Sequence, residues 1–273
     1  MDSRVEGLGL GSIQEINALP HEVAEALYAR LVPEELLDRF AIDPSTLCDK
    51  DGARLVRVTA PADKPWGRVE VRSSPDDRDP ALLVDVEMSP FSVPELAFVQ
   101  ITDPTGPRYA IDRDPDGRDT LFGTAARNLE EERRAMREGL APGQVRRGLR
   151  LLSRVLDAME GFCALMGKEI YLIEPLFYHS AVLYERRGCG YLLGRDIMEE
   201  IHAGFAGGGP LAGALDGSSD FRHPPAADSV RGRSWALHDG IGDGLWGAGA
   251  SGVKMYKVAG RLAGVNTFPG APY

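Results

Sequence analysis

Apolar and polar residues alternate along the chain in two different ways. In residues 19–42 the apolar positions recur every three or four residues, which predicts a helix that Pro33 breaks or restarts. From residue 53 to residue 113 the period changes to two, which is typical of strands with one buried face. These predicted strands span residues 54–59, 67–72, 81–88, 96–102 and 108–113. Short strands separated by turn residues predict an antiparallel meander.

Helical periodicity returns after residue 127. A charged helical segment comes first, and the strongest amphipathic pattern of the sequence follows it. Beyond this helix we expect a buried strand, a short helix and another strand, with two more strands near the end of the chain. In order, these elements span residues 128–140, 148–166, 169–174, 180–187, 190–194, 234–239 and 253–258.

The last part of the chain differs from the rest in composition. Residues 203–273 hold 16 of the 32 glycines, and the tract GGGPLAGALDGSSD indicates a loop or lid. We therefore predict two parts. Residues 1–202 form an α/β domain with a mixed, mostly antiparallel sheet flanked by helices, and residues 203–273 form a glycine-rich C-terminal extension that serves as a lid, an arm or extra strands.

Composition and charge narrow the classes of partner. The chain of 273 residues has a net charge of −10, which argues against nucleic acid and anionic membranes as main partners. Three cysteines without CxxC spacing fit a reducing cytoplasm. The N-terminus shows no signal-peptide pattern, and no run approaches the roughly 18–20 apolar residues that span a membrane.

Two motifs suggest a metal or an acid–base pair, and each is incomplete. The stretch IDRDPDGRDT, residues 111–120, opens like a calcium loop, but Gly123 stands where such a loop needs a glutamate. None of the five histidines has metal-ligand spacing, so we predict no metal site. His238 and Asp239 could act as a base and its orienting carboxylate in a hydrolase or lyase, although neighbours on one strand point to opposite faces.

The segment that opens the strong helix is a candidate anion site. It reads APGQVRRGLRLL, residues 141–152, and combines glycines and arginines with a helix N-terminus. Backbone N–H groups and arginine side chains can both bind phosphate. A solvated basic first turn is the alternative. The candidate ligands in this segment are Gln144, Val145, Arg146, Arg147, Gly148, Leu149 and Arg150.

Together with a second stretch, this segment resembles the GNAT superfamily of acyl-CoA-dependent N-acyltransferases. HSAVLYERRGC, residues 179–189, is similar to the family pattern A-x-x-L-Y-x-x-x-G-F, and QVRRGLR, residues 144–150, is a degenerate form of the loop Q/R-x-x-G-x-G/A. The order of predicted helices, meander, long helix, strand and short helix is also similar. The resemblance covers residues 144–194, extended back through the meander.

The resemblance implies transfer of an acetyl or other acyl group from CoA, as co-substrate, to a small-molecule or peptide amine. It implies that residues 144–150 hold the pyrophosphate and that Tyr184 is the general acid that protonates the leaving thiolate. Glu87, on a predicted strand, is the candidate base, with a solvated strand face as the alternative. A homodimer is compatible with this interpretation.

A non-catalytic role stays open beside the acyltransferase. A GNAT-like module could bind a ligand or partner through its C-terminal segment. The aromatic residues that would make these contacts are Trp235, Trp246 and Tyr256.

Overall fold

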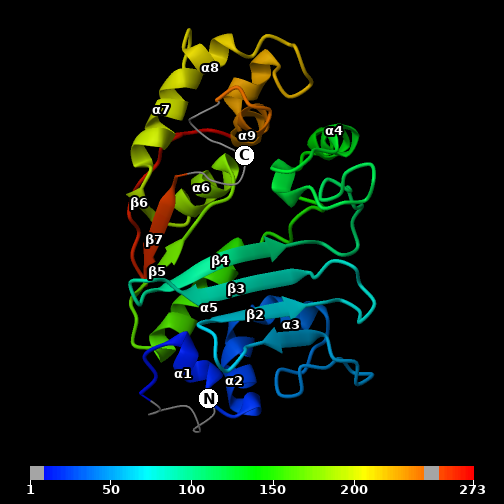
Figure 1. Ribbon diagram of the computed structural model, residues 1–273, viewed down its shortest axis with the longest axis vertical. Helices are drawn as coiled ribbons and strands as arrows, with labels where there is room; N and C mark the ends of the chain where they lie inside the picture. Colours follow the sequence, from blue (N-terminus) through cyan, green and yellow to red (C-terminus); the bar gives the residue numbers. More distant parts are fainter. Residues whose placement is uncertain (1–8, 243–251) are drawn as a thin grey trace. The chain divides into compact units, whose positions relative to one another are not determined.

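The computed structural model describes residues 9–242 and 252–273, and the chain forms two compact units (Figure 1). The first unit comprises Met1–Pro104, Gly148–Ile173 and Val258–Gly260, and the second comprises Thr105–Arg147, Glu174–Lys257 and Arg261–Tyr273. The boundary predicted between residues 202 and 203 falls within the second unit and stays a prediction. The segment proposed to hold a pyrophosphate, residues 144–150, contributes to both units.

The first unit begins with short helices. The break at Pro33 is confirmed, because this residue is the N-cap of α3. The helix α1 was not predicted, although the hydroxyl of Ser12 accepts a hydrogen bond from the Glu15 N–H at 3.2 Å, which is a capping pattern visible in the sequence. These helices are α1 (Ile13–Asn17), α2 (His21–Tyr28), a 3-10 turn (Ala29–Leu31) and α3 (Glu34–Arg39).

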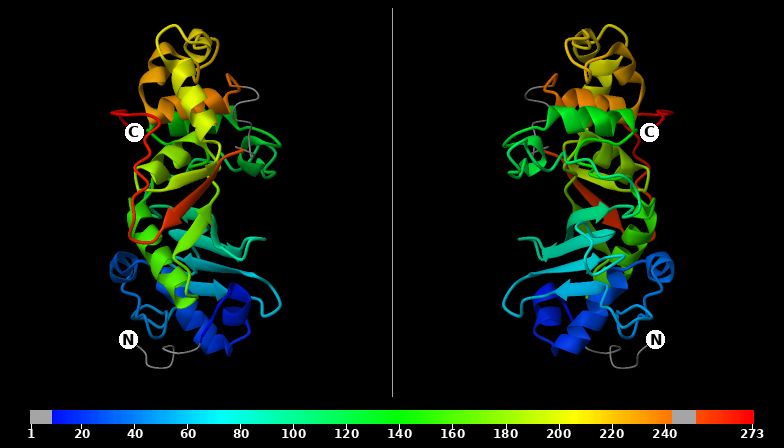
Figure 2. Two further views of the ribbon diagram at one scale, coloured as in Figure 1. Left: turned by 90° about the vertical axis from the view of Figure 1, so that its left-hand side faces the viewer. Right: turned by 90° about the vertical axis from the view of Figure 1, so that its right-hand side faces the viewer.

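Five strands form the sheet of the first unit, in the order β1-β2-β3-β4-β5. The first four make the predicted antiparallel meander, and β5 lies parallel to β4. Their bounds are β1 (Val56–Thr59), β2 (Trp66–Val71), β3 (Leu82–Met88), β4 (Pro94–Ile101) and β5 (Ile170–Ile173). The core lies between one face of these strands and the helices of this unit, which Figure 2 shows on the same side of the sheet.

The long helix α5 (Leu152–Leu165) precedes β5 in the chain and buries Val155, Leu156, Met159, Phe162 and Cys163, as its periodicity predicts. The predicted start at residue 148 is wrong. Arg150 has a φ of +62°, which lies outside the right-handed helical region, so the helix begins only at Leu152.

The second unit is mainly helical. Its elements are a 3-10 turn (Leu121–Gly123), α4 (Leu129–Arg137), α6 (Tyr178–Glu185), β6 (Gly190–Leu193), α7 (Arg195–Phe205), α8 (Pro210–Gly213), a 3-10 turn (Pro224–Asp228), α9 (Val230–His238) and β7 (Lys254–Val258). β6 and β7 pair antiparallel, which confirms both predicted strands. The helix α7 was not predicted. A buried cluster around Trp235 and Phe221, whose rings stack at 5.1 Å, forms the core between α4 and α9.

Two strand predictions in this unit are wrong. Residues 108–113 form a loop whose alternation arises because Tyr109 and Ile111 are buried beside Trp235, and not because of a strand ladder. Residues 234–239 belong to the end of α9. Every residue of this helix from 233 through 237 is buried. A fully buried segment shows no alternation of apolar and polar positions, so its sequence does not distinguish a helix from a strand.

The described residues therefore form an α/β structure with a mostly antiparallel sheet and flanking helices. Within these residues no helix is both long and apolar enough to cross a membrane. The glycine-rich composition after residue 203 does not produce one long loop, because three helical segments and a strand follow it.

Two glycines in the first unit should respond oppositely to alanine. A Cβ at Gly67 in β2 would overlap the ring of Tyr28, whereas a Cβ at Gly161 in α5 would meet open space. We expect Gly67→Ala to destabilise the protein by about 1–3 kcal/mol through overpacking. Gly161→Ala should stabilise it by up to about 1 kcal/mol through helix propensity. Chemical denaturation followed by circular dichroism measures both, and a shift of the same sign in both variants would contradict this packing.

Candidate functional site

The pairing between the parallel strands β4 and β5 is short. Within the part of the chain that the structure describes, they pair at two positions, Glu95 with Leu172 and Leu96 with Ile173, and Ile173 is the last residue of β5. Beyond Leu96, β4 continues to Ile101, paired with β3. The register with β3 also skips Ala97, which places a β-bulge directly after the last pair with β5. A bulge leaves one residue outside the ladder and re-aims its backbone groups.

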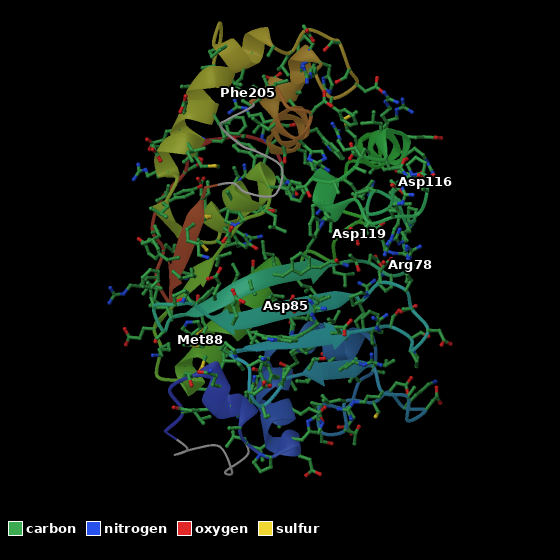
Figure 3. All side chains as sticks on the ribbon, in the orientation of Figure 1. Arg78, Asp85, Met88, Asp116, Asp119 and Phe205 are labelled. Atoms are coloured by element: carbon green, nitrogen blue, oxygen red, sulfur yellow. The ribbon has the colours of Figure 1, made fainter. Side chains whose placement is uncertain are left out.

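An ion pair fixes the neighbouring strands beside this bulge. The guanidinium of Arg68 on β2 donates to both carboxylate oxygens of Asp85 at 2.6 and 2.7 Å. Asp85 lies directly opposite Phe98 in the strand register, at the point where the register shifts (Figure 3 labels Asp85). Two parallel N–H···O bonds restrict both side chains, so the bulge has a defined position.

The turn before α5 lies against the end of β4. A Cβ at Gly148 would stand 3.2 Å from the carbonyl oxygen of Ile101, which is a tight contact, so glycine eases this approach of the two segments. Arg150 then adopts the left-handed φ that favours glycine. No side chain caps the start of α5 at Leu151. The first N–H groups of α5 are thus without a side-chain acceptor, as at helix ends that bind anions.

Four other predicted ligands of this segment, residues 144–147, lie in the second unit, where their side chains already make other contacts. The Gln144 side chain accepts a hydrogen bond from the Ala141 N–H at 2.8 Å, and Val145 is a core residue. Arg146 donates to the carbonyl of Gly106, and Arg147 donates to the carbonyl of Glu138 at 2.9 Å. Phosphate binding by these two guanidiniums would compete with existing bonds. Leu149, in the first unit, is half-buried and has no polar side-chain atom.

Glu87, the candidate base, is an exposed residue of β3 in the first unit. Its cross-strand neighbours are Trp66 on β2 and the buried Glu95 on β4. Two like charges directly opposite one another on neighbouring strands repel. The role of Glu87 as a base stays a prediction.

Tyr184 lies at the end of α6 in the second unit and is buried, with 7% of its surface exposed. Burial, and to a smaller extent the Cys189 thiol, raises the pKa of its phenol. The phenol therefore keeps its proton at neutral pH. The adjacent Glu185 anchors this helix end, because its carboxylate accepts hydrogen bonds from Tyr191 and from the hydroxyl and N–H of Thr267, at 2.6 and 3.0 Å for the latter two.

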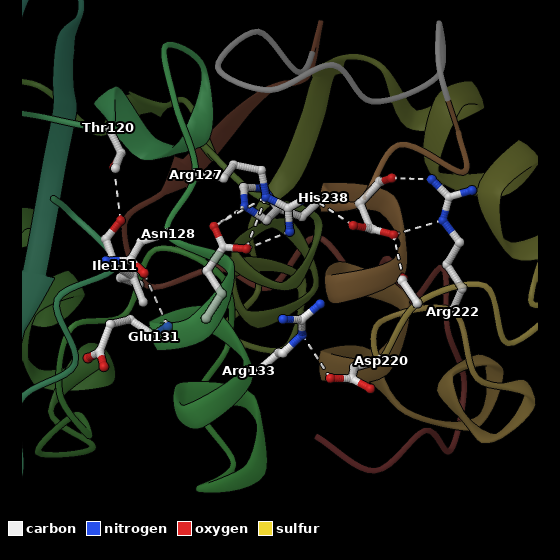
Figure 4. Close-up of polar contacts among 12 residues, drawn as sticks. Ile111, Thr120, Arg127, Asn128, Glu131, Arg133, Asp220, Arg222 and His238 are labelled. Carbon is white, nitrogen blue, oxygen red and sulfur yellow. Dashed lines mark hydrogen bonds and ion pairs between the residues drawn. The ribbon is translucent and has the colours of Figure 1, made fainter. Parts of the chain in front are cut away.

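A buried ionic network in the second unit was not predicted (Figure 4). Arg127 donates to Glu132 of α4 and to Asp239, which follows α9, with distances of 2.5 and 2.8 Å. The ring Nε2 of His238 lies 3.3 Å from the other oxygen of Glu132. Burial opposes the charge of Glu132, but the bonds from His238 and Arg127 prevail and lower its pKa. The network thus clamps α4 to α9.

Asp239 has partners of its own in this network. Its carboxylate accepts hydrogen bonds from Ser219 at 2.7 Å and from Arg222 at 2.8 Å, besides that from Arg127. Burial opposes its charge, yet these three bonds lower its pKa. His238 and Asp239 therefore face different partners, and Asp239 does not orient the His238 ring. The arrangement offers no support for a hydrolase or lyase that uses this pair.

The hypothesis of a binding module requires exposed aromatic residues in the C-terminal segment, and the two that the structure describes are not exposed. Trp235 is buried, and its indole N–H donates to the carbonyl of Leu140 at 2.8 Å. Tyr256 is a half-buried residue of β7 beside Gly190. Trp246 lies outside the described residues. Neither of the two described aromatics forms an exposed contact surface.

Comparison with known proteins found no matching family model, no matching curated protein and no matching solved structure.

The acidic turn resembling a calcium loop binds its own backbone. The carboxylate of Asp114 accepts hydrogen bonds from the N–H groups of Asp116 and Arg118 at 2.9 and 2.8 Å. Within residues 9–242 and 252–273 no group of three His, Cys, Asp or Glu side chains could hold a metal ion.

The buried ionic network of Arg127, Glu132, His238 and Asp239 had no clear signal in the sequence, because α4 and α9 are far apart in the chain.

Removing one charge from the buried network should lower the free energy of unfolding. Glu132→Gln leaves Arg127 without one of its two carboxylates, and we expect a loss of about 3–5 kcal/mol in unfolding free energy at pH 7. As control, Asp116→Asn removes an ion pair with Arg118 whose side chains are 70% and 78% exposed, and should change stability by less than about 1 kcal/mol. Urea denaturation at pH 7 measures both variants.

The effect of Glu132 should also depend on pH in one direction. Its folded pKa is lowered, so its contribution is complete above the unfolded value of about 4.3 and disappears as the pH falls through the folded value. The stability difference between wild type and Glu132→Gln should therefore shrink below about pH 4. A difference that stays constant down to pH 3 would contradict a charged Glu132.

Proposed function

We propose that the chain is an acyl-CoA-dependent N-acyltransferase of GNAT type. The observation that carries the proposal is the end of the β4–β5 pairing at Leu96 and Ile173, followed on β4 by a bulge at Ala97 and a glycine turn beside Ile101. An extended ligand binds a strand edge through main-chain hydrogen bonds, and β4 runs on to Ile101 beyond its last pair with β5. The resemblance of residues 144–150 and 179–189 to family motifs supports the same function.

The start of α5 is the proposed binding site for the pyrophosphate. Its first N–H groups have no side-chain cap, and a helix N-terminus favours negative charge. Gly148 permits a close approach of the backbone, and Arg150 adds a positive charge in the same turn. Since Arg146 and Arg147 donate to backbone carbonyls, Arg150 is the arginine assigned to the phosphate.

In the proposed reaction the amine nitrogen attacks the thioester carbonyl, a C–N bond forms and the C–S bond breaks. The N–H of Ala97 polarises the carbonyl oxygen, which gains negative charge during the attack. The amine loses a proton to a base or to water, and the sulfur leaves as a thiolate that is finally protonated. The resemblance of residues 179–189 to the family motif assigns to Tyr184 the hydrogen bond to the sulfur, with solvent as the final proton source.

Acetyl-CoA should stabilise the folded protein if this proposal holds. Ligand binding raises the melting temperature by mass action, and we expect a rise of a few degrees once its concentration exceeds the Kd about tenfold. Tyr184→Phe should keep this rise but lower kcat with an acceptor amine by at least about tenfold, because one hydrogen bond is lost. Tyr109→Phe makes the same change elsewhere in the second unit and should leave both unaffected. Absence of any shift at millimolar acetyl-CoA contradicts the proposal.

Two substitutions of Arg150 should have the same effect on CoA affinity but different effects on folding stability. We expect Arg150→Gly and Arg150→Ala both to weaken CoA binding by about 10–100-fold, since each removes a charge-assisted hydrogen bond. Arg150→Gly should be the more stable of the two by about 1 kcal/mol, because glycine adopts the positive φ without strain. Isothermal titration calorimetry measures the affinity, and denaturation measures the stability. Unchanged affinity in both variants would exclude Arg150 from the site.

A further inference from the structure

A histidine without an acidic partner lies in the core of the second unit. His179 belongs to α6 and is 4% exposed. Its Nδ1 lies 2.9 Å from the Ser234 hydroxyl on α9, and its Nε2 lies 3.5 Å from the Ser180 hydroxyl. Among the described residues, no carboxylate forms an ion pair with this ring. A hydroxyl can donate to a neutral ring or accept from it, so this site suits the uncharged imidazole.

The other charged groups near His179 are positive or potentially positive. Arg231 and His238 of α9 both disfavour its protonation. Arg231 is held in place because it donates to the carbonyls of Gly139 and Tyr273. The remaining neighbours are aromatic, since the His179 ring stacks on Phe177 at 5.5 Å and meets Tyr273 edge-on at 6.5 Å. Glu132 of the buried network contacts His238.

We propose that His179 is an acid-sensitive switch in the packing of α6 against α9, so that protonation of its buried ring opens this contact and neutral pH closes it. A positive charge at this position would face Arg231 and His238 with no anion to offset it. Hydration of the charged ring then requires that the two helices separate. The inference concerns the second unit alone and does not depend on the proposed acyl transfer.

The direction of the effect follows from proton linkage. Burial first, and then His238 and Arg231, lower the pKa of His179 to about 3. In the open state the ring takes the ordinary value of about 6.5. The open state therefore binds more protons, so the closed state is fully favoured above pH 6.5 and loses stability as the pH falls. For one proton, the open fraction rises about tenfold for each pH unit below 6.5.

The buried network should stay intact over the same pH range. Glu132 and Asp239 have lowered pKa values and remain charged between pH 6.5 and pH 5. Their bonds with Arg127 continue to connect α4 to α9 while α6 is released. The expected opening is thus local to α6 and its contact with α9, and it precedes acid unfolding of the network. The helix that opens also carries Tyr184.

Hydrogen exchange resolved by mass spectrometry tests the switch on the full chain. Between pH 7 and pH 5.5, after correction for the intrinsic exchange rate, we expect the protection of residues 178–185 to fall about tenfold. Residues 66–88 of the first unit should keep their protection. His179→Asn preserves a polar atom near the Nδ1 position but cannot titrate, and should abolish the fall. His21→Asn is the matched control, because the His21 side chain is 79% exposed, and it should behave as the wild type.

A measurement on the wild-type protein keeps the test decisive if His179→Asn does not fold. The ring resonances of the five histidines can be followed by NMR from pH 8 to pH 5. The His179 signal should not shift gradually with pH. It should instead lose intensity over the same pH range in which residues 178–185 lose their protection from exchange. The proposal is overturned if all five rings titrate near pH 6.5 while this protection persists, or if wild type and His179→Asn lose protection equally.

Discussion

The site proposed in the first unit depends on one constraint, the end of the pairing between β4 and β5 after Leu96. A parallel pair that continued would satisfy the backbone of both strands and leave no place for an extended ligand. The bulge at Ala97 begins where this pairing ends, and the pair of Arg68 with Asp85 holds the neighbouring strands in register. The approach of Gly148 to Ile101 then places the uncapped start of α5 beside the end of β4.

Electrostatics divide the second unit into two regions, one that keeps charged side chains and one that excludes a charge. Both lose stability as the pH falls, but the region around His179 does so at the higher pH. In one region Glu132 and Asp239 stay charged, because the hydrogen bonds from Arg127 and its neighbours outweigh the cost of burial. In the other, His179 stays neutral, because burial and nearby positive groups exclude a charge. Both regions meet on α9, which carries His238, Arg231 and Ser234. The same helix can therefore be held firmly on one side and released on the other.

How much the sequence predicted depends on whether the local period was clear. The strands β2 and β3 and the helix α5 were predictable from their period, because each shows one buried face. β4 was also predicted as a strand, although its burial does not alternate. Residues 108–113 alternate in the same way, yet Tyr109 and Ile111 enter a core cluster from a loop, which local pattern cannot distinguish from a strand. The end of α9 has no exposed face around Trp235 and so no period at all.

The candidate site was less predictable than the fold. The motif identified the segment around Gly148, but only coordinates show that Arg150 adopts a left-handed φ and that Arg147 donates to a carbonyl. The clamp of Arg127, Glu132 and Asp239 joins residues more than a hundred positions apart, as the separation of 112 between Arg127 and Asp239 shows. Such contacts follow from tertiary structure, and no local pattern encodes them.

The central claim is that CoA binds along residues 97–101 of β4, beyond the last pair with β5, and at the start of α5. Amide resonances recorded with and without CoA test it most directly, because each backbone N–H reports on its own surroundings. We predict the largest shifts at residues 97–101 and 148–152, with those of α1 unchanged. Shifts confined to other segments, or no shift at millimolar CoA, would contradict the claim.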